Sequence, residues 1–171
     1  GLFGACSTMA LSLAMAGVFV DSNAAKTAVA ATSSHFCSAE RQFRLPLEYG
    51  GQRPPQAQWT ATAAGAAVVE KEGKGVTIEA VTYGKICDMG VTDANNMGAA
   101  MAPAAADTIA AYFRETGESL SEFDHIVTGD LGAIGSKLLA ELLNSEHRLD
   151  ISGMHKDCGT MLYNIDEQDV N

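Results

Sequence analysis

The sequence predicts a layered α/β domain in which helices pack against sheets of short strands. Three observations support this fold class. An apolar segment over residues 7–20 has the length and uniform hydrophobicity of a buried helix. Residues 27–32 form a run of small and β-branched residues suited to a buried strand. In the second half, strand-like and helical segments alternate, which predicts parallel strands joined by crossover helices.

The remaining elements of the first half follow from turn residues. Residues 44–58 contain Pro and Gly at a density typical of a long loop, and loops of this length in compact domains are usually functional or disordered. Two strands are expected at 59–63 and 66–70, with a break near Gly65 because glycine weakens strand pairing.

The second half contains five expected elements. Apolar alternation over 76–86 predicts a strand. A helix is expected over 103–114, opened by its first-turn proline, and another over 130–143, capped by its first aspartate. Strands are expected at 124–128 and 160–165. The boundary between the halves is expected between residues 75 and 76, so residues 1–75 carry the cysteine helix and the Pro/Gly loop, and residues 76–171 begin the second half.

Composition narrows the class of protein. Of the 171 residues, 47% are hydrophobic and 19% charged, which indicates a globular chain with a sizeable core. The net charge of -10 argues against nonspecific nucleic-acid binding. The longest apolar run is too short for a transmembrane segment. Spacing typical of zinc ligands is absent from the sequence, and no metal or cofactor is expected. The four cysteines are Cys6, Cys37, Cys87 and Cys158.

The candidate site is the segment Gly4-Ala5-Cys6-Ser7-Thr8 before the apolar helix. A thiol in the first turn of a helix faces N–H groups without helical partners and the positive end of the helix dipole. Both stabilise a thiolate, and the same N–H groups can bind a carboxylate. The small residues before the cysteine allow a tight strand-to-helix turn. A buried structural cysteine is the alternative interpretation.

This turn, the small-residue segment 59–69 and the strand-like segment 124–130 resemble the thiolase and ketoacyl synthase superfamily. Within that superfamily the chain is similar to the stage V sporulation protein AD (SpoVAD) family over nearly its whole length. The Pro/Gly loop is the most specific part of this resemblance. The segments that carry it are residues 4–8, 33–35, 40–44, 48–55, 57–60, 128–132 and 155–159.

The resemblance implies a thiolase-like layered α-β-α fold in a protein of endospore-forming Firmicutes. It implies binding of dipicolinic acid, alone or with calcium. It also implies membership of the SpoVA assembly, which moves this compound across the spore inner membrane during sporulation and germination. The protein is then expected in the forespore or spore, in the cytoplasm or peripheral to the inner membrane, with other SpoVA proteins as partners. Superfamily members are commonly dimers, so a homodimer is a further expectation. The family protein is longer at both ends, so a partial chain is expected.

The resemblance favours binding over catalysis. A condensing synthase needs a thiol, a His and a second donor such as Asn. The position of the His falls at Gly129, and the neighbouring Asp130 would disfavour an oxyanion. Dipicolinate is a planar dianion that suits a helix N-terminus and an Arg. The expected ligand-binding residues are Cys6, Ser7, Thr8, His35 and Arg53.

Alternatives exist for these residues and for the function. His35 could be a core histidine, and Arg53 could form a structural ion pair. No catalytic residue is expected, except Cys6 if the chain is an acyl-transferring or condensing enzyme. A third interpretation is a degenerate fold that only docks partner membrane proteins.

Overall fold

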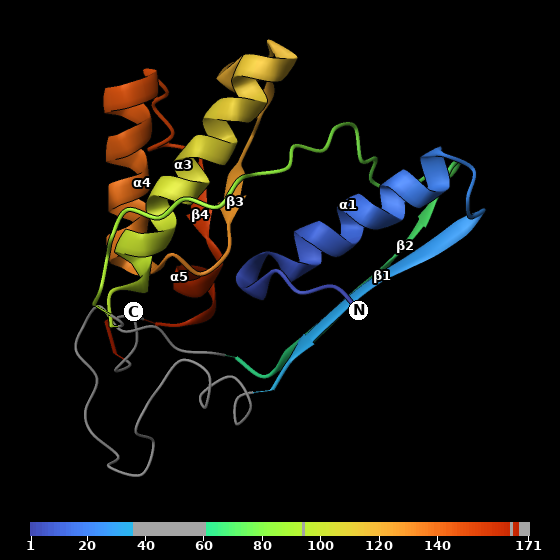
Figure 1. The fold of residues 1–171 in the computed structure, drawn as a ribbon, viewed down its shortest axis with the longest axis horizontal. Coiled ribbons are helices and arrows are strands. Elements are labelled where there is room, and N and C mark those ends of the chain that lie inside the picture. Colours follow the sequence, from blue (N-terminus) through green and yellow to red (C-terminus); the bar gives the residue numbers. More distant parts are fainter. Residues whose placement is uncertain (36–60, 94, 165, 168–171) are drawn as a thin grey trace. The chain divides into compact units, whose positions relative to one another are not determined.

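The computed structural model describes residues 1–35, 61–93, 95–164 and 166–167. The chain forms two compact units (Figure 1). The first unit comprises Gly1–Glu48 and Thr60–Val81, and the second comprises Tyr49–Trp59 and Thr82–Asn171. Each unit combines helices with a two-stranded sheet, so the expected mixed α/β class is confirmed at this level.

The first unit is a helix packed on an antiparallel strand pair. A 3₁₀ turn, η1 (Ala5–Ser7), leads into α1 (Thr8–Asp21), followed by β1 (Thr27–Ser34) and β2 (Ala63–Glu70). The strands pair in register from Thr27 opposite Glu70 to Ser34 opposite Ala63. The expected helix and first strand are therefore confirmed as elements, but the expectation of a buried strand is wrong, because Ala30 is the only buried residue of β1. The expected break near Gly65 is wrong, because Gly65 pairs with Thr32 inside a continuous ladder.

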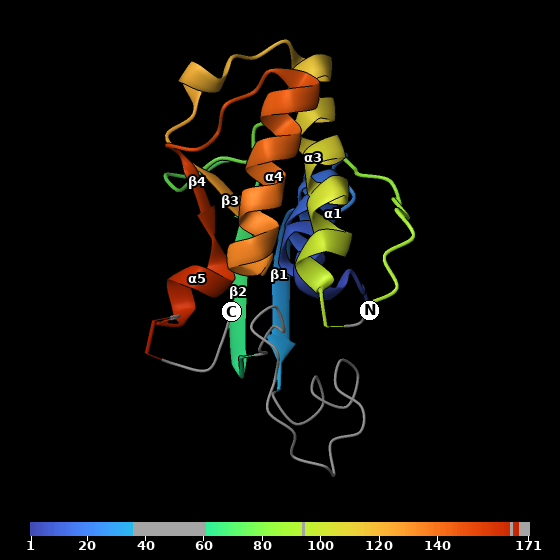
Figure 2. The ribbon, with the colours of Figure 1, turned by 90° about the vertical axis from the view of Figure 1, so that its left-hand side faces the viewer.

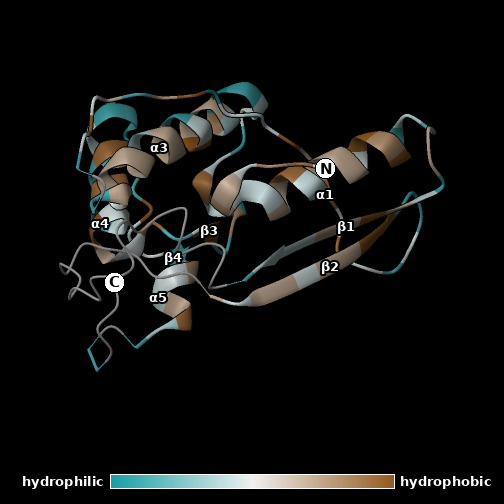
Figure 3. Cartoon of the chain, turned by 60° about the horizontal axis from the view of Figure 1, so that its bottom comes forward, coloured by the Kyte–Doolittle hydropathy of each residue, from teal (hydrophilic) through white to brown (hydrophobic). Residues whose placement is uncertain are grey.

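The described residues cover α1 only in part. Ser12, Ala14, Ala16 and Val20 are buried, whereas Val18 is 48% and Phe19 50% exposed. Figure 3 shows how much of this helix is apolar. The expectation of burial on all sides is therefore wrong for these residues, although the helix is apolar enough to be buried on every side.

The second unit contains α3 (Met97–Thr116), η3 (Leu120–Glu122), β3 (Ile126–Thr128), α4 (Gly132–His147), β4 (His155–Asp157) and α5 (Cys158–Leu162). The strands β3 and β4 are parallel and are joined through α4. The expected parallel crossover is therefore confirmed, but its second strand lies at His155–Asp157 and not at the expected 160–165. Helices α3 and α4 lie side by side (Figures 1 and 2). The core between them is apolar and includes Ala102, Ala106, Leu139, Leu143 and Ile151.

The two long helices approach closely at a pair of glycines. A Cβ built on Gly98 would lie 2.6 Å from the carbonyl oxygen of Leu131 and 2.9 Å from the backbone nitrogen of Gly135. A Cβ built on Gly135 would lie 2.9 Å from the Cα of Gly98. Side chains at either position would force the helices apart, so these glycines set the packing of α3 on α4.

The starts of both long helices differ from expectation. α3 begins at Met97, because the Asn96 side chain accepts a hydrogen bond from the Ala99 amide and caps the helix earlier. Pro103 lies inside α3 rather than in its first turn, where it removes one backbone donor. At α4, Leu131 occupies the N-cap position instead of the expected Asp130.

Two expected strands are wrong. Residues 76–93 contain neither helix nor strand. Val76 and Ile86 are almost fully exposed, so the apolar alternation does not bury one face of a sheet. The expected strand at 160–165 is replaced by α5, because the Asp157 side chain accepts hydrogen bonds from the Gly159 and Thr160 amides and starts a helix there.

Candidate functional site

The predicted cysteine turn lies at the start of α1. Cys6 is the middle residue of η1, and its side chain is exposed. The preceding Ala5 has φ of 46°, a left-handed conformation that costs a non-glycine residue roughly 1–2 kcal/mol. Backbone strain of this kind is concentrated at functional sites. The described residues therefore do not bury Cys6.

Two hydroxyl groups hold this turn. The Ser7 hydroxyl donates to the Gly4 carbonyl at 2.7 Å. The Thr8 hydroxyl donates to the Ala5 carbonyl at 2.7 Å and accepts from the Gly4 amide at 3.0 Å. Ser7 occupies the N-cap position of α1 without capping a helical N–H through its side chain. Ser7 and Thr8 therefore fix the conformation in which Cys6 is presented.

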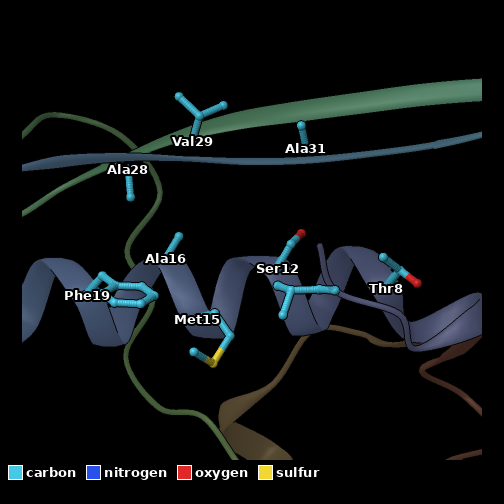
Figure 4. A pocket seen from close by; sticks show the side chains of 9 residues that line it. Thr8, Ser12, Met15, Ala16, Phe19, Ala28, Val29 and Ala31 are labelled. Atoms are coloured by element: carbon cyan, nitrogen blue, oxygen red, sulfur yellow. The ribbon is translucent and has the colours of Figure 1, made fainter. Parts of the chain in front are cut away.

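A pocket of about 240 Å³ lies between α1 and β1 (Figure 4). Ser12 and Ala16 point from α1 toward the strand, and Ala28 points from β1 toward the helix. Of the predicted ligand-binding residues that the structure describes, Thr8 lines this pocket, whereas Cys6, Ser7 and His35 do not. The pocket is mostly apolar, so it suits the hydrophobic part of a ligand better than an isolated charge.

His35 and Arg53 are the two predicted ligand-binding residues outside the cysteine turn. His35 follows the last residue of β1 and is exposed, so it is not a core histidine. Arg53 lies outside the described residues.

A second polar cluster, not predicted from the sequence, lies at the carboxyl ends of β3 and β4. Thr128 and Asp157 are opposite each other in the parallel ladder. Asp157 is only 2% exposed. Its Oδ1 accepts hydrogen bonds from the Thr128 hydroxyl at 2.9 Å and the Leu131 amide at 2.8 Å, and its Oδ2 accepts from the Gly132 amide at 3.2 Å. The carboxylate therefore accepts hydrogen bonds from N–H groups at the start of α4, which have no acceptor within the helix.

The same carboxylate begins α5. Oδ2 of Asp157 accepts from the Gly159 amide at 3.1 Å and the Thr160 amide at 3.4 Å. The Thr160 hydroxyl donates to the Asp157 carbonyl at 3.1 Å. One buried side chain thus joins two strands to the first turns of two helices.

His155 extends this network. Its Nε2 lies 2.9 Å from the Thr128 hydroxyl oxygen, which donates its own proton to Asp157. Geometry therefore assigns a protonated Nε2 that donates to Thr128. Burial lowers the pKa of His155, and the charge of Asp157 opposes that shift.

Two further groups of the cluster have raised pKa values. Burial, followed by the charge of Asp157, raises the pKa of Asp130 to about 7. Burial, followed by the charges of Asp157 and Asp130, raises the pKa of the Cys158 thiol. A reactive cysteine needs the opposite environment, so Cys158 suits a neutral thiol.

Sequence reasoning used residues 155–159 only as a mark of resemblance. A signal for the cluster was nevertheless available in the sequence, because Asp157 precedes Gly159 and Thr160 at the spacing of a helix N-cap. The carboxyl ends of adjacent parallel strands meet at one edge of a sheet, which predicts a neighbouring polar residue from β3. Among the described residues, no group of His, Cys, Asp or Glu could hold a metal ion.

These features define a mixed α/β protein with an exposed cysteine at a strained helix start and a buried aspartate that joins parallel strands to helices. The family model for Stage V sporulation protein AD (SpoVAD) matches residues 1–171. The chain is 46% identical over 167 residues to "Stage V sporulation protein AD" of Bacillus subtilis (strain 168), an alignment that covers 98% of this chain and 49% of that protein. The chain belongs to the SpoVAD family of sporulation proteins.

The chain spans about half the length of the curated relative it matches. None of the helices in the described part combines the length and apolar character needed to cross a membrane.

Proposed function

We propose that this chain contributes a dipicolinate-binding site to the SpoVA assembly, and that the turn from Gly4 to Thr8 receives the ligand. The protein then takes part in moving dipicolinic acid, or its calcium complex, across the spore inner membrane. Family membership supports the sporulation role. The observation that carries the assignment of the turn is the strained Ala5, which presents an exposed Cys6 at the start of a helix.

The chemistry of the turn suits an anion. The amides of Ser7 and Thr8 already donate to the Gly4 and Ala5 carbonyls, so the turn attracts an anion through the helix dipole, which adds partial positive charge at the start of α1. The thiol of Cys6 and the hydroxyl of Ser7 add polar atoms beside that end. The pocket next to Thr8 offers an apolar surface for a planar ring. We propose the thiolase-like layered fold as the frame of this site, with other SpoVA proteins as partners and a homodimer as the oligomeric state.

Calorimetric titration of the intact protein with dipicolinate tests this function. Saturable binding is expected, and Cys6→Ala and Ser7→Ala are expected to weaken it. Loss of one hydrogen bond worth about 1 kcal/mol lowers affinity roughly fivefold. A matched control is Ser22→Ala, because Ser22 also donates to a carbonyl three residues earlier, at the opposite end of α1. Absence of binding, or equal affinity in all variants, would contradict the proposal.

A second candidate function is acyl transfer or condensation through Cys6. The specific observation in its favour is the exposed side chain of Cys6 on a strained turn, because a nucleophile must be accessible. Mass spectrometry after incubation with acyl-CoA distinguishes the two functions. A stable adduct on Cys6 would favour the enzyme, whereas dipicolinate binding without an adduct would favour the binding protein.

A further inference from the structure

In the second unit, the carboxyl groups of Asp130 and Asp157 lie against the same backbone position, Gly159. Asp157 ends β4, and Asp130 lies two residues after the end of β3. A Cβ built on Gly159 would collide with Oδ1 of Asp130 and would lie 3.1 Å from Oδ2 of Asp157. The Oδ1 atom of Asp130 is itself buried. Both carboxyl groups therefore pack against the backbone of Gly159, which has room for no side chain.

The surroundings of Asp157 supply several hydrogen-bond donors to its carboxyl group. Its oxygens accept from the amides of Leu131, Gly132 and Gly159 and from the Thr128 hydroxyl. Hydrogen bonds donated to a carboxylate stabilise the charged form, and the start of α4 adds the positive end of a helix dipole. The charge of Asp157 is the one that opposes ionisation of Asp130.

Asp130 ionises with difficulty beside that charge. Two carboxylates in one buried site disfavour each other, so one of them retains its proton to higher pH. Burial and then the Asp157 charge raise the pKa of Asp130 from 3.8 to about 7. The other titratable groups of the cluster are Cys158 of α5, whose pKa is raised, and His155 of β4, whose pKa is lowered by burial. Both directions favour a neutral group near pH 7, so neither offsets a second negative charge.

We propose that Asp157 acts as a clamp between the ends of β3 and β4 and the starts of α4 and α5, and that the neighbouring Asp130 makes this clamp sensitive to protons, so that it holds while Asp130 is protonated. The clamp loosens when that proton leaves, because two charges then occupy one buried site. Its stabilising effect is complete below the unfolded pKa of 3.8 and is lost as the pH rises through about 7. This device is independent of the ligand proposed for the Cys6 turn.

Hydrogen exchange of the intact protein tests the clamp through the amides of Leu131, Gly132 and Gly159. After correction for intrinsic exchange, their protection in the unmodified protein is expected to fall up to about tenfold between about pH 6 and about pH 8. Asp130→Asn mimics the protonated carboxyl, so its protection is expected to stay nearly constant. Asp124→Asn, at an exposed aspartate before β3, is the matched control and is expected to follow the unmodified protein.

Infrared spectroscopy of the unmodified protein gives a second readout that does not depend on a folded variant. A protonated carboxyl band is expected to disappear with a midpoint near pH 7. The proposal is overturned if no carboxyl band titrates near neutral pH. It is equally overturned if Asp130→Asn folds and loses protection with pH as the unmodified protein does.

Discussion

Oδ1 of Asp157 accepts a hydrogen bond from the amide of Leu131 at 2.8 Å, across a separation of 26 residues. This contact closes the β3–α4–β4 unit, because it ties the last residue of the second strand to the start of the helix that joins the strands. The same carboxylate caps the start of α5. The arrangement of β3, α4, β4 and α5 therefore depends on one buried side chain.

Replacement of that side chain is expected to be costly. Asp157→Ala would leave buried amides at the starts of α4 and α5 without an acceptor, and each such group costs about 1–3 kcal/mol. We expect a loss of roughly 3 kcal/mol or more in the free energy of unfolding, measured by chemical denaturation. Asp150→Ala is the control, since its exposed carboxyl accepts from Ser152 and from no other described residue, and it should change the denaturation midpoint little. Equal effects of both variants would refute a central role for Asp157.

The glycine contact between α3 and α4 provides a second test. Gly98→Ala would place a methyl group 2.6 Å from the Leu131 carbonyl oxygen, where the backbone must shift. Overpacking of this kind costs about 1–3 kcal/mol. Gly153→Ala is the matched control, because a Cβ at Gly153 meets nothing within 4 Å. Thermal unfolding should show a lower midpoint for Gly98→Ala alone, and an unchanged midpoint would mean that the helices are not in close contact there.

Ala5 and Ala10 are expected to respond in opposite directions to the same substitution. Ala5→Gly removes a methyl group from a residue with φ of 46°, so it should stabilise the protein by up to about 1 kcal/mol. Ala10→Gly replaces an exposed residue inside α1 and should destabilise by about 1 kcal/mol. Denaturation curves of the two variants measure both changes. A destabilised Ala5→Gly variant would show that the turn carries no strain.

The Cys158 thiol should ionise at higher pH than an ordinary cysteine. Burial and two neighbouring aspartates raise its pKa, so its alkylation by iodoacetamide should reach half-maximal rate at a higher pH than in an unfolded peptide of the same sequence. Asp130→Asn removes one of the charges and should move this profile toward lower pH. The rates follow from mass spectrometry of the peptide that contains Cys158. A profile identical to that of the free peptide would contradict the environment described for this residue.

The sequence predicts those elements whose structure depends mainly on their own residues. The helix at α1 and the strand at β1 follow from unbroken apolar or β-branched runs, and β3, α4 and a parallel crossover follow from alternation, although β4 lies before the expected strand. The starts of α3 and α5 were missed because side-chain caps at Asn96 and Asp157 override the proline signal and the β-propensity of the following residues. At 76–86, the apolar alternation predicts a strand with one buried face. This prediction is wrong because burial depends on tertiary contacts that a local pattern does not contain.

The candidate site also has one part that the sequence predicts and one part that it does not. A local motif was enough to place Cys6 at a helix start, because glycine, small residues and an apolar run are adjacent in the chain. The Asp157 cluster depends on Thr128, which is 29 residues away in sequence and becomes a neighbour only through the parallel ladder. The raised pKa values of Asp130 and Cys158 arise first from burial, which composition does not reveal.

A crystal structure of the intact protein soaked with dipicolinate tests the proposed function most directly. The account predicts a planar dianion at the start of α1, with one carboxylate beside Cys6 and Ser7 and with Ala5 retaining its positive φ. Dipicolinate bound only at another part of the protein, or its absence at saturating concentration, would contradict the assignment of this turn as the binding site.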